Sequence, residues 1–413
     1  MKRSPLLLLL VVWIAFSGVA AADDWPWWRG PNRNGIADPL QSIPLQWSES
    51  ENIIWKTPVP GRGHSSITLV GDRAYLATAE ADRETRSVVC LDRQTGAVLW
   101  STDVHTGNVT PYKNKKGSDA SSTIACDGER LFVNFLHDSS MVTSALSLDG
   151  KILWQKRICD YVVHQAYGSS PAVYGPLVIV TADNKSGGAV AGLRRKDGST
   201  VWKHARPAVP NYASPIIFDV AEKPQLLLTG CDLVSSFDPL SGEKLWEVAG
   251  ATTECVTTTV TDGERMFTSG GYPRNHISAV KCDGTGEVAW ENGTRMYVPS
   301  MLVHRGYLYG ATDAGVAMCW KSATGEEMWK GRLGGTFSSS PVLVGDQIVV
   351  TNEAGRTFVF KANPAAFELI AENQLGEECF ATPTICDGRI YTRVAHVSDE
   401  GRQEFVYCIG KTP

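Results

Sequence analysis

A glycine followed four positions later by a tryptophan recurs along this chain, and this repeat constrains its fold more than any other feature. The six copies are Gly96 with Trp100, Gly150 with Trp154, Gly198 with Trp202, Gly242 with Trp246, Gly286 with Trp290 and Gly325 with Trp329. Trp55 lies about 45 residues before Trp100 and extends the series without a glycine of its own. A period of this size indicates a repeat architecture, in place of the two or three separate domains that a length of 413 residues would otherwise suggest.

Two further patterns share the same period. A glycine turn such as Asp127-Gly128 leads into a short β-rich run, and a pair of small, mostly hydroxylic residues such as Ser339-Ser340 precedes each turn. The hydroxylic pattern occurs in eight units, and seven of these units contain the turn glycine. Short β-rich runs separated by turns indicate an all-β protein, and four strands in about 45 residues match one propeller blade. The sequence therefore predicts an eight-bladed β-propeller of four-stranded blades.

The ends of the repeat region indicate how the ring closes. The eighth unit ends after its third strand, at residues 404–409, while residues 52–56 read as an outer strand without a blade. Pairing the two would remove an open sheet edge that otherwise invites aggregation. We therefore expect the N-terminal strand to complete the C-terminal blade.

The repeated tryptophans are interpreted as packing residues that fill the wedge between neighbouring blades. They are Trp55, Trp100, Trp154, Trp202, Trp246, Trp290 and Trp329. The alternative, a ring that stacks on a cofactor or base, does not suit a position repeated seven times.

The N-terminus has the three parts of a secretory signal peptide. Lys2 and Arg3 precede an apolar run at residues 6–16, and small residues lead to an expected cleavage site after Ala22. The alternative is an uncleaved membrane anchor, but the run is short for a span of about 20 residues. We therefore expect export to the periplasm or the cell exterior, and no transmembrane segment in the mature chain.

Three segments follow from these patterns. Residues 1–22 are the signal peptide, residues 23–51 form a Trp- and Pro-rich cap, and residues 52–413 form the propeller. A net charge of −5 argues against a nucleic-acid-binding surface. The ten cysteines occur at repeat-equivalent positions, which favours small buried hydrophobes, although export leaves disulfides open.

The run Leu-Asp-Arg-Gln-Thr-Gly-Ala-Val-Leu-Trp at 91–100 and its copy at 237–246 resemble the repeat of the pyrroloquinoline-quinone-like (PQQ-like) β-propellers. The resemblance covers residues 52–410, and the segment at 25–31 is similar to the leader of many such propellers. It implies one of two functions. Quinoprotein dehydrogenases bind PQQ and Ca²⁺ on the propeller axis and oxidise alcohols or sugars, whereas BamB-like members are non-catalytic docking scaffolds.

The residues favour the second branch. The adjacent cysteine pair typical of the quinoprotein dehydrogenases is absent, as is a Cys-x-x-Cys-His haem motif, and the family's Glu, Asn and Asp set for Ca²⁺ has no match. No metal-binding His spacing or nucleophile elbow occurs either, so the neighbours His64 and Ser65 are interpreted as part of a loop. The sequence thus predicts no catalytic residue, metal or cofactor. A PQQ- and Ca²⁺-dependent dehydrogenase with degenerate ligands is the alternative.

Blade topology places two sets of connections on one face: those from an outer strand to the next inner strand, and those from second to third strand. We call this the loop face, because loops are where binding residues concentrate. Its longest connection is expected at residues 101–119, with Lys113, Lys115 and Lys116 near its end. The residues expected around the axial funnel are His64, Asp119, His164, Tyr212, Glu254, Arg295 and Glu378.

This funnel is predicted to bind a protein segment or a small polar ligand, the alternative being a solvated rim with no ligand. The sequence as a whole favours an exported, monomeric, BamB-like scaffold with a protein partner in the cell envelope.

Overall fold

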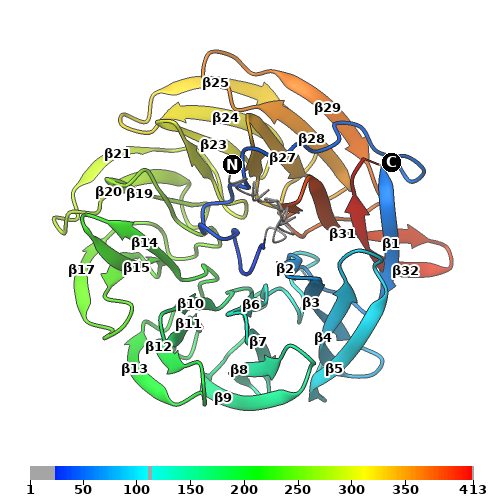
Figure 1. Cartoon of the computed structure of the whole chain (residues 1–413). Helices are drawn as coiled ribbons and strands as arrows, with labels where there is room; N and C mark the ends of the chain where they lie inside the picture. The colour runs from blue at the N-terminus through cyan, green and yellow to red at the C-terminus, as the bar shows by residue number, and fades with distance from the viewer. Residues whose placement is uncertain (1–23, 110–113, 412–413) are drawn as a thin grey trace, which may run out of the picture.

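The computed structural model describes residues 24–109 and 114–411. These residues form eight four-stranded antiparallel sheets arranged as blades around one axis (Figure 1), and they contain no helix. The all-β, eight-bladed propeller predicted from the repeat is confirmed. The expected signal peptide, residues 1–22, and Lys113 lie outside the described residues.

The strands of the first four blades run from the axis outwards in chain order. The first blade comprises β2 (Thr68–Val70), β3 (Arg73–Glu80), β4 (Thr85–Asp92) and β5 (Val98–Thr106). The second comprises β6 (Ala125–Cys126), β7 (Arg130–His137), β8 (Ser140–Ser147) and β9 (Ile152–Asp160). The third comprises β10 (Ala172–Tyr174), β11 (Leu177–Thr181), β12 (Gly188–Arg194) and β13 (Thr200–Arg206). The fourth comprises β14 (Ile216–Val220), β15 (Lys223–Gly230), β16 (Leu233–Phe237) and β17 (Lys244–Ala249).

The other blades repeat this order until the last. The fifth comprises β18 (Val260–Thr261), β19 (Arg265–Gly270), β20 (His276–Lys281) and β21 (Val288–Asn292). The sixth comprises β22 (Leu302–His304), β23 (Tyr307–Ala311), β24 (Val316–Lys321) and β25 (Glu327–Arg332). The seventh comprises β26 (Val342–Val344), β27 (Gln347–Thr351), β28 (Arg356–Lys361) and β29 (Leu369–Gln374). The eighth comprises β30 (Thr384–Cys386), β31 (Arg389–Ser398), β32 (Gly401–Ile409) and β1 (Ile53–Val59).

The ring closes through β1. This N-terminal strand pairs antiparallel with β32, from Ile53 opposite Ile409 to Val59 opposite Glu404. The closure predicted from the two ends of the repeat region is therefore confirmed. Because β1 is the outer strand of the eighth blade, the first and last strands of the propeller share one sheet (Figure 1).

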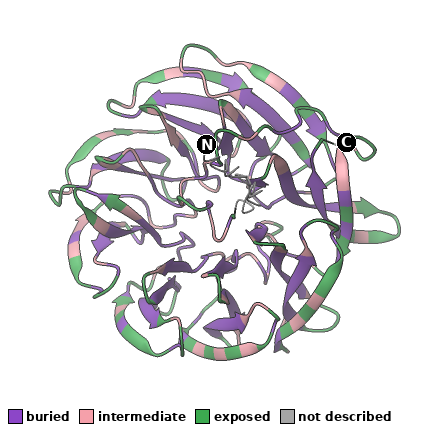
Figure 2. Ribbon diagram, viewed as in Figure 1, coloured by how far each residue is buried: buried purple, intermediate pink, exposed green. Residues whose placement is uncertain are grey.

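Burial follows the position of a strand within its blade. The second and third strands are almost wholly buried between neighbouring blades, whereas outer strands such as β5 alternate exposed and covered residues (Figure 2). This alternation is the period-2 pattern of a strand with one solvent-facing side.

Each repeated tryptophan contacts the blade that follows its own. The Trp202 ring lies against Gly242, where an added Cβ would come within 2.5 Å of the ring, and its Nε1 donates to the Pro239 carbonyl. Gly242 has a φ of 75°, a conformation that favours glycine. The same ring-on-glycine contact recurs for Trp55, Trp100, Trp154 and Trp290.

Two blades depart from this pattern. Trp246 donates its Nε1 to Gln225 of its own blade, and Val248 occupies the place over Gly286. The seventh blade has no motif glycine, and there Phe367 packs on Trp329 with 5.5 Å between ring centroids.

The segment at 24–51 crosses the centre of the ring on the face of the short glycine turns (Figure 1). Trp25 forms a β-bridge with Leu69 of the first blade, and Ile36 forms one with Leu343 of the seventh. Between them, Arg29 is 2% exposed and donates to the carbonyls of Pro341 and Met301. Burial lowers the pKa of Arg29 to about 9. The segment thus ties the first and second blades to the sixth and seventh across the axis.

All ten cysteines lie within the described residues and are free thiols. Nine are buried and Cys159 is partly buried, as small hydrophobes would be. Within residues 24–109 and 114–411, no helix is long and apolar enough to cross a bilayer.

Candidate functional site

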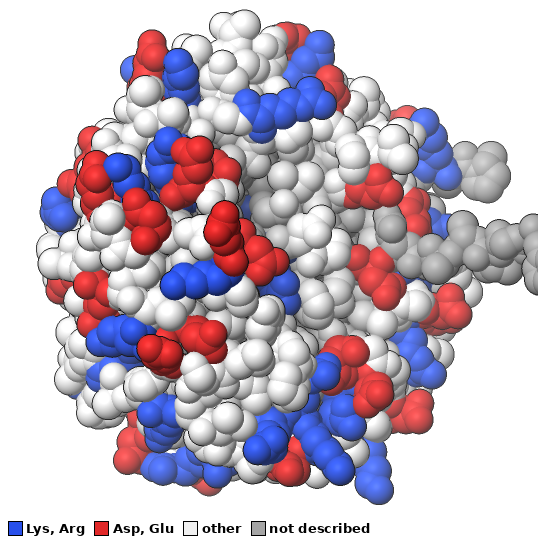
Figure 3. All heavy atoms as spheres, turned by 60° about the vertical axis from the view of Figure 1, so that its left-hand side comes forward, with Lys and Arg blue, Asp and Glu red and all other residues white. Residues whose placement is uncertain are grey.

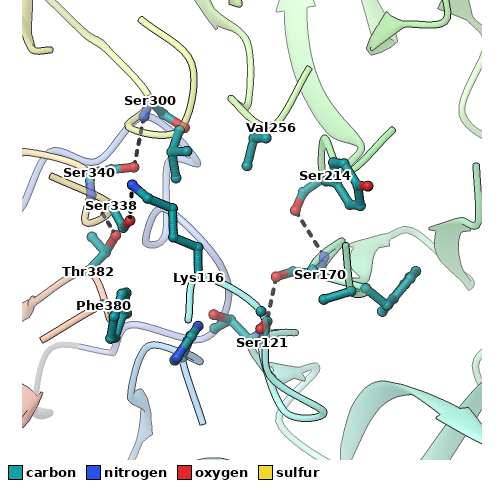
Figure 4. A pocket seen from close by; sticks show the side chains of 18 of the residues that line it. Lys116, Ser121, Ser170, Ser214, Val256, Ser300, Ser338, Ser340, Phe380 and Thr382 are labelled. Carbon is teal, nitrogen blue, oxygen red and sulfur yellow. Dashed lines mark hydrogen bonds between the residues drawn. The ribbon is translucent and has the colours of Figure 1, made fainter. Parts of the chain in front are cut away.

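A cavity of about 230 Å³ lies on the propeller axis, at the point where the loop-face connections enter the inner strands (Figure 4). Its floor includes the ring of Trp28, which comes from the segment on the opposite face. Trp28 Nε1 donates to Thr258 Oγ1 over 2.8 Å. The cavity is therefore a cup that opens toward the loop face.

A belt of hydroxyl groups surrounds the axis at the level of this floor. In six places, the backbone N–H of a Ser or Thr in one blade donates to the hydroxyl of the equivalent residue in the next blade. Figure 4 shows two of these bonds, from Ser170 to Ser214 and from Ser300 to Ser340. The accepting residues are Thr123, Ser170, Ser214, Ser300, Ser340 and Thr382, at distances of 2.9–3.0 Å. The small hydroxylic residues that repeat in the sequence are thus the contacts between adjacent inner strands.

The connection from the first blade to the second contributes to the mouth of the cup. Lys116 extends across the cavity toward Ser338 (Figure 4), with 3.3 Å between Nζ and Oγ, and also pairs with Glu353. Lys115 pairs with the same carboxylate over 3.1 Å. Burial acts to raise the pKa of Glu353, but the bonds from Lys116 and Ser338 outweigh it and hold this pKa below its usual value. The expected start of this connection at Ser101 was wrong, because β5 continues as paired strand to Thr106.

Two of the predicted funnel residues line the cavity. His64 stacks on Phe380, with 4.3 Å between ring centroids. Burial, with a contribution from Arg62, lowers the pKa of His64 well below its usual value, so the ring is neutral. Tyr212 is 9% exposed, and its hydroxyl lies against the backbone of Gln165 with no hydrogen-bond partner of normal geometry.

Three more predicted residues gather around Tyr297, which also lines the cavity. The Tyr297 hydroxyl donates to Glu254 over 2.9 Å, and His164 Nε2 lies 3.1 Å from the same carboxylate. The guanidinium of Arg295 covers the Tyr297 ring at 5.2 Å. These side chains form the edge of the cup between the third and sixth blades.

The last two predicted residues belong to ion pairs outside the cavity lining. Asp119 pairs with Arg86 over 3.0 Å, and Glu378 pairs with Arg402 over 2.8 Å. The structure therefore brings five of the seven residues to the cup or its edge, whereas these two lie in the connections before the second and eighth blades and pair with blade arginines.

Sequence reasoning missed several lining residues. Trp28 stands outside the repeat, so no periodicity marks it. Phe380 follows Cys379 in the connection that leads into the inner strand β30, where a core role is equally expected. The hydroxyl belt and Lys116 were visible as patterns, but only the closed ring places them around one cavity.

The lining does not match a calcium–quinone centre. Its described residues include no carboxylate, and no group of three or more His, Cys, Asp or Glu side chains in the described chain is placed to hold a metal ion. Ca²⁺ takes six to eight oxygen ligands, typically with carboxylates among them. On the side of the molecule shown in Figure 3, acidic and basic side chains are interspersed and do not form a broad basic patch.

The comparisons with known proteins agree on a family. The model described as "Outer membrane protein assembly factor BamB" matches residues 46–111, 84–225 and 231–365. The outer membrane protein assembly factor BamB of Burkholderia pseudomallei is 30% identical over 159 residues, which is 38% of this chain and 34% of that protein. The matched stretch thus spans about a third of that relative's length.

Similar solved structures include both branches of the fold. BamB from Moraxella catarrhalis superposes with a TM-score of 0.61 at 16% identity, covering 86% of this chain and 96% of its own. Quinohemoprotein alcohol dehydrogenase from Comamonas testosteroni gives 0.69 at 12% identity, covering 96% and 82%. A europium-containing methanol dehydrogenase gives 0.67 at 11% identity, covering 94% and 98%.

At these identities the structural likeness shows the fold alone, whereas the family model covers well over half of the sequence. The chain therefore belongs to the family of BamB-like, PQQ-like β-propellers.

Proposed function

We propose that this protein is an exported, monomeric and non-catalytic binding propeller of the cell envelope, which holds a protein partner on its loop face as an assembly scaffold. Membership of the BamB-like family supports a scaffold role. The cup supports binding over oxidation, since its described lining lacks the carboxylates that a calcium-assisted quinone would need.

The observation that carries the proposal is an apolar surface beside the cup. Val162 and Val163 are 50% and 46% exposed in the connection before the third blade, and Tyr272 is 55% exposed between β19 and β20. They flank the His164–Glu254 pair, because His164 follows Val163 and Glu254 forms a β-bridge with Tyr272. Scattered exposed apolar residues are ordinary, but a group on the loop face at the edge of a cavity is typical of a protein interface.

Site-specific photocrosslinking in the native cell envelope tests this proposal. A photoreactive side chain at position 163 or 272 is expected to form an adduct with one and the same envelope protein, identified by mass spectrometry. Position 288 on β21 is the matched control, because Val288 is 45% exposed but belongs to the outer strand of its blade, away from the axis.

The proposal requires adducts from both loop-face positions and none of the same protein from position 288. Changing Tyr272 to Asp should then abolish the adduct at position 163, because a charge on the apolar surface opposes docking. Absence of a shared adduct, or equal crosslinking from the control position, would contradict partner docking on this face.

A further inference from the structure

The floor of the cup holds hydrogen-bond donors that the fold does not use. Seven hydroxyls line the cavity, those of the six accepting belt residues and that of Thr258: Thr123, Ser170, Ser214, Thr258, Ser300, Ser340 and Thr382. Each accepts one bond from a neighbouring N–H, yet none donates its own hydrogen to another described atom. All are at most 7% exposed. A hydroxyl can donate as well as accept, so seven O–H donors converge on one buried space.

The charged side chain among the described residues that line the cavity is positive, which favours a negatively charged ligand. No carboxylate is among the described lining residues, and Lys116 is the cation among them. Its ammonium has three N–H donors, of which Glu353 and Ser338 use two. Because Lys115 also pairs with Glu353, two positive charges share one negative charge at the mouth.

A further polar side chain, that of Tyr212, lines the same cavity. The Tyr212 hydroxyl is buried and has no hydrogen-bond partner of normal geometry, although a buried polar group normally has one. The rings of Trp28 and Phe380 give the lining an apolar part, which suits the aliphatic stem of a ligand. The volume of about 230 Å³ lies below the roughly 300–1,000 Å³ of most small-molecule pockets, so only a small group fits.

We propose that the cup binds a peptide carboxylate, inserted from the loop face so that its oxygens accept bonds from the belt hydroxyls and Lys116. This inference rests on the proposed function, because it supplies the anchor by which a partner segment is held. Bonds to an ionised acceptor are about twice as strong as neutral ones, so an acid-free donor array selects a carboxylate over an amide of the same shape. The carboxylate has two sources, the side group of a Glu or Asp and the C-terminus of a polypeptide.

Isothermal calorimetry of the mature protein with three small probes tests the inference. N-acetyl-glutamate amide presents the carboxylate of a glutamate side group, N-acetyl-glycylglycine presents a C-terminal one, and N-acetyl-glutamine amide is the neutral isostere. At least one acidic probe should bind about tenfold or more tightly than the glutamine probe. The acidic probe that binds more tightly identifies the source.

A matched pair of variants localises the binding. Lys116→Gln and Lys115→Gln each remove one partner of Glu353, but only Lys116 lines the cavity. Lys116→Gln should lower the affinity for the acidic probe about tenfold, while Lys115→Gln should change that affinity by no more than about twofold. Val256→Phe adds bulk at a partly exposed position of the lining and should abolish binding in a folded protein.

Equal affinity for the acidic and neutral probes, no binding of any probe, or equal effects of the two lysine variants would overturn the inference. Crosslinking at positions 163 and 272 tests the proposed function independently of probe binding. If those adducts form while the acidic probes do not bind, the partner docks without inserting a carboxylate. If neither adducts nor probe binding are observed, the proposed function is contradicted as well.

Discussion

Replacing Glu404 by glutamine is expected to lower the free energy of unfolding by about 3–5 kcal/mol, since it breaks a buried ion pair while leaving the buried charge of Arg393 in place. Glu404 and Arg393 contact each other with their side chains 2% and 1% exposed. Arg393 also donates to the Ala77 carbonyl of the first blade, and Glu404 accepts from the Gly63 N–H. The pair therefore stabilises the junction between the last blade and the first.

Urea unfolding followed by circular dichroism measures the effect. Glu372→Gln is the matched control, because Glu372 pairs with Arg356 on the surface, where such pairs contribute at most about 1 kcal/mol. Adding Arg393→Met to Glu404→Gln should recover part of the loss, because the uncompensated charge is then gone. A Glu404→Gln protein as stable as the Glu372→Gln control would show that this pair does not hold the ring closed.

Replacing Trp202 by alanine is expected to cost about 3–5 kcal/mol, the range for deleting a large buried aromatic side chain. Trp202 is 7% exposed, and its ring fills the space over Gly242 in the next blade. Gly242→Ala changes the glycine partner of the same contact. Its Cβ would meet the Trp202 ring at 2.5 Å and would carry a side chain at a φ of 75°, so we expect a loss of about 2–4 kcal/mol.

Gly293→Ala is the control for the glycine variant, because a Cβ there meets nothing within 4 Å and its φ is ordinary. It should change stability by no more than about 0.5 kcal/mol. Similar small effects of Gly242→Ala and Gly293→Ala would contradict the view that each tryptophan packs on the glycine turn of the next blade.

The blade number and the ring closure were predictable from the sequence because the units carry the same local signals. A glycine and a tryptophan at fixed spacing mark the first six blades, and the unpaired run before Trp55 matches the missing strand of the eighth. These features depend on local turn chemistry and strand pattern, which a sequence displays directly.

The site was less predictable because its contacts join distant parts of the chain. Ser66 and Thr123 are adjacent only because consecutive inner strands lie side by side, and Lys116 meets Glu353 only because its connection reaches the seventh blade. Trp28 reaches the axis from the opposite face, and because it lies outside the repeat, no periodic pattern predicts this contact. His64 and Tyr212 were found because they stand at the entry of inner strands, a position that topology alone places near the axis.

The most direct test of whether this propeller binds a partner instead of oxidising a substrate is a dye-reduction assay. Purified mature protein is incubated with PQQ and Ca²⁺, and reduction of an artificial electron acceptor is then followed with alcohols and sugars, against PQQ and Ca²⁺ alone. The cup lining predicts no reduction above the protein-free control. Sustained, protein-dependent reduction of the dye would contradict the binding role and place this protein with the quinoprotein dehydrogenases.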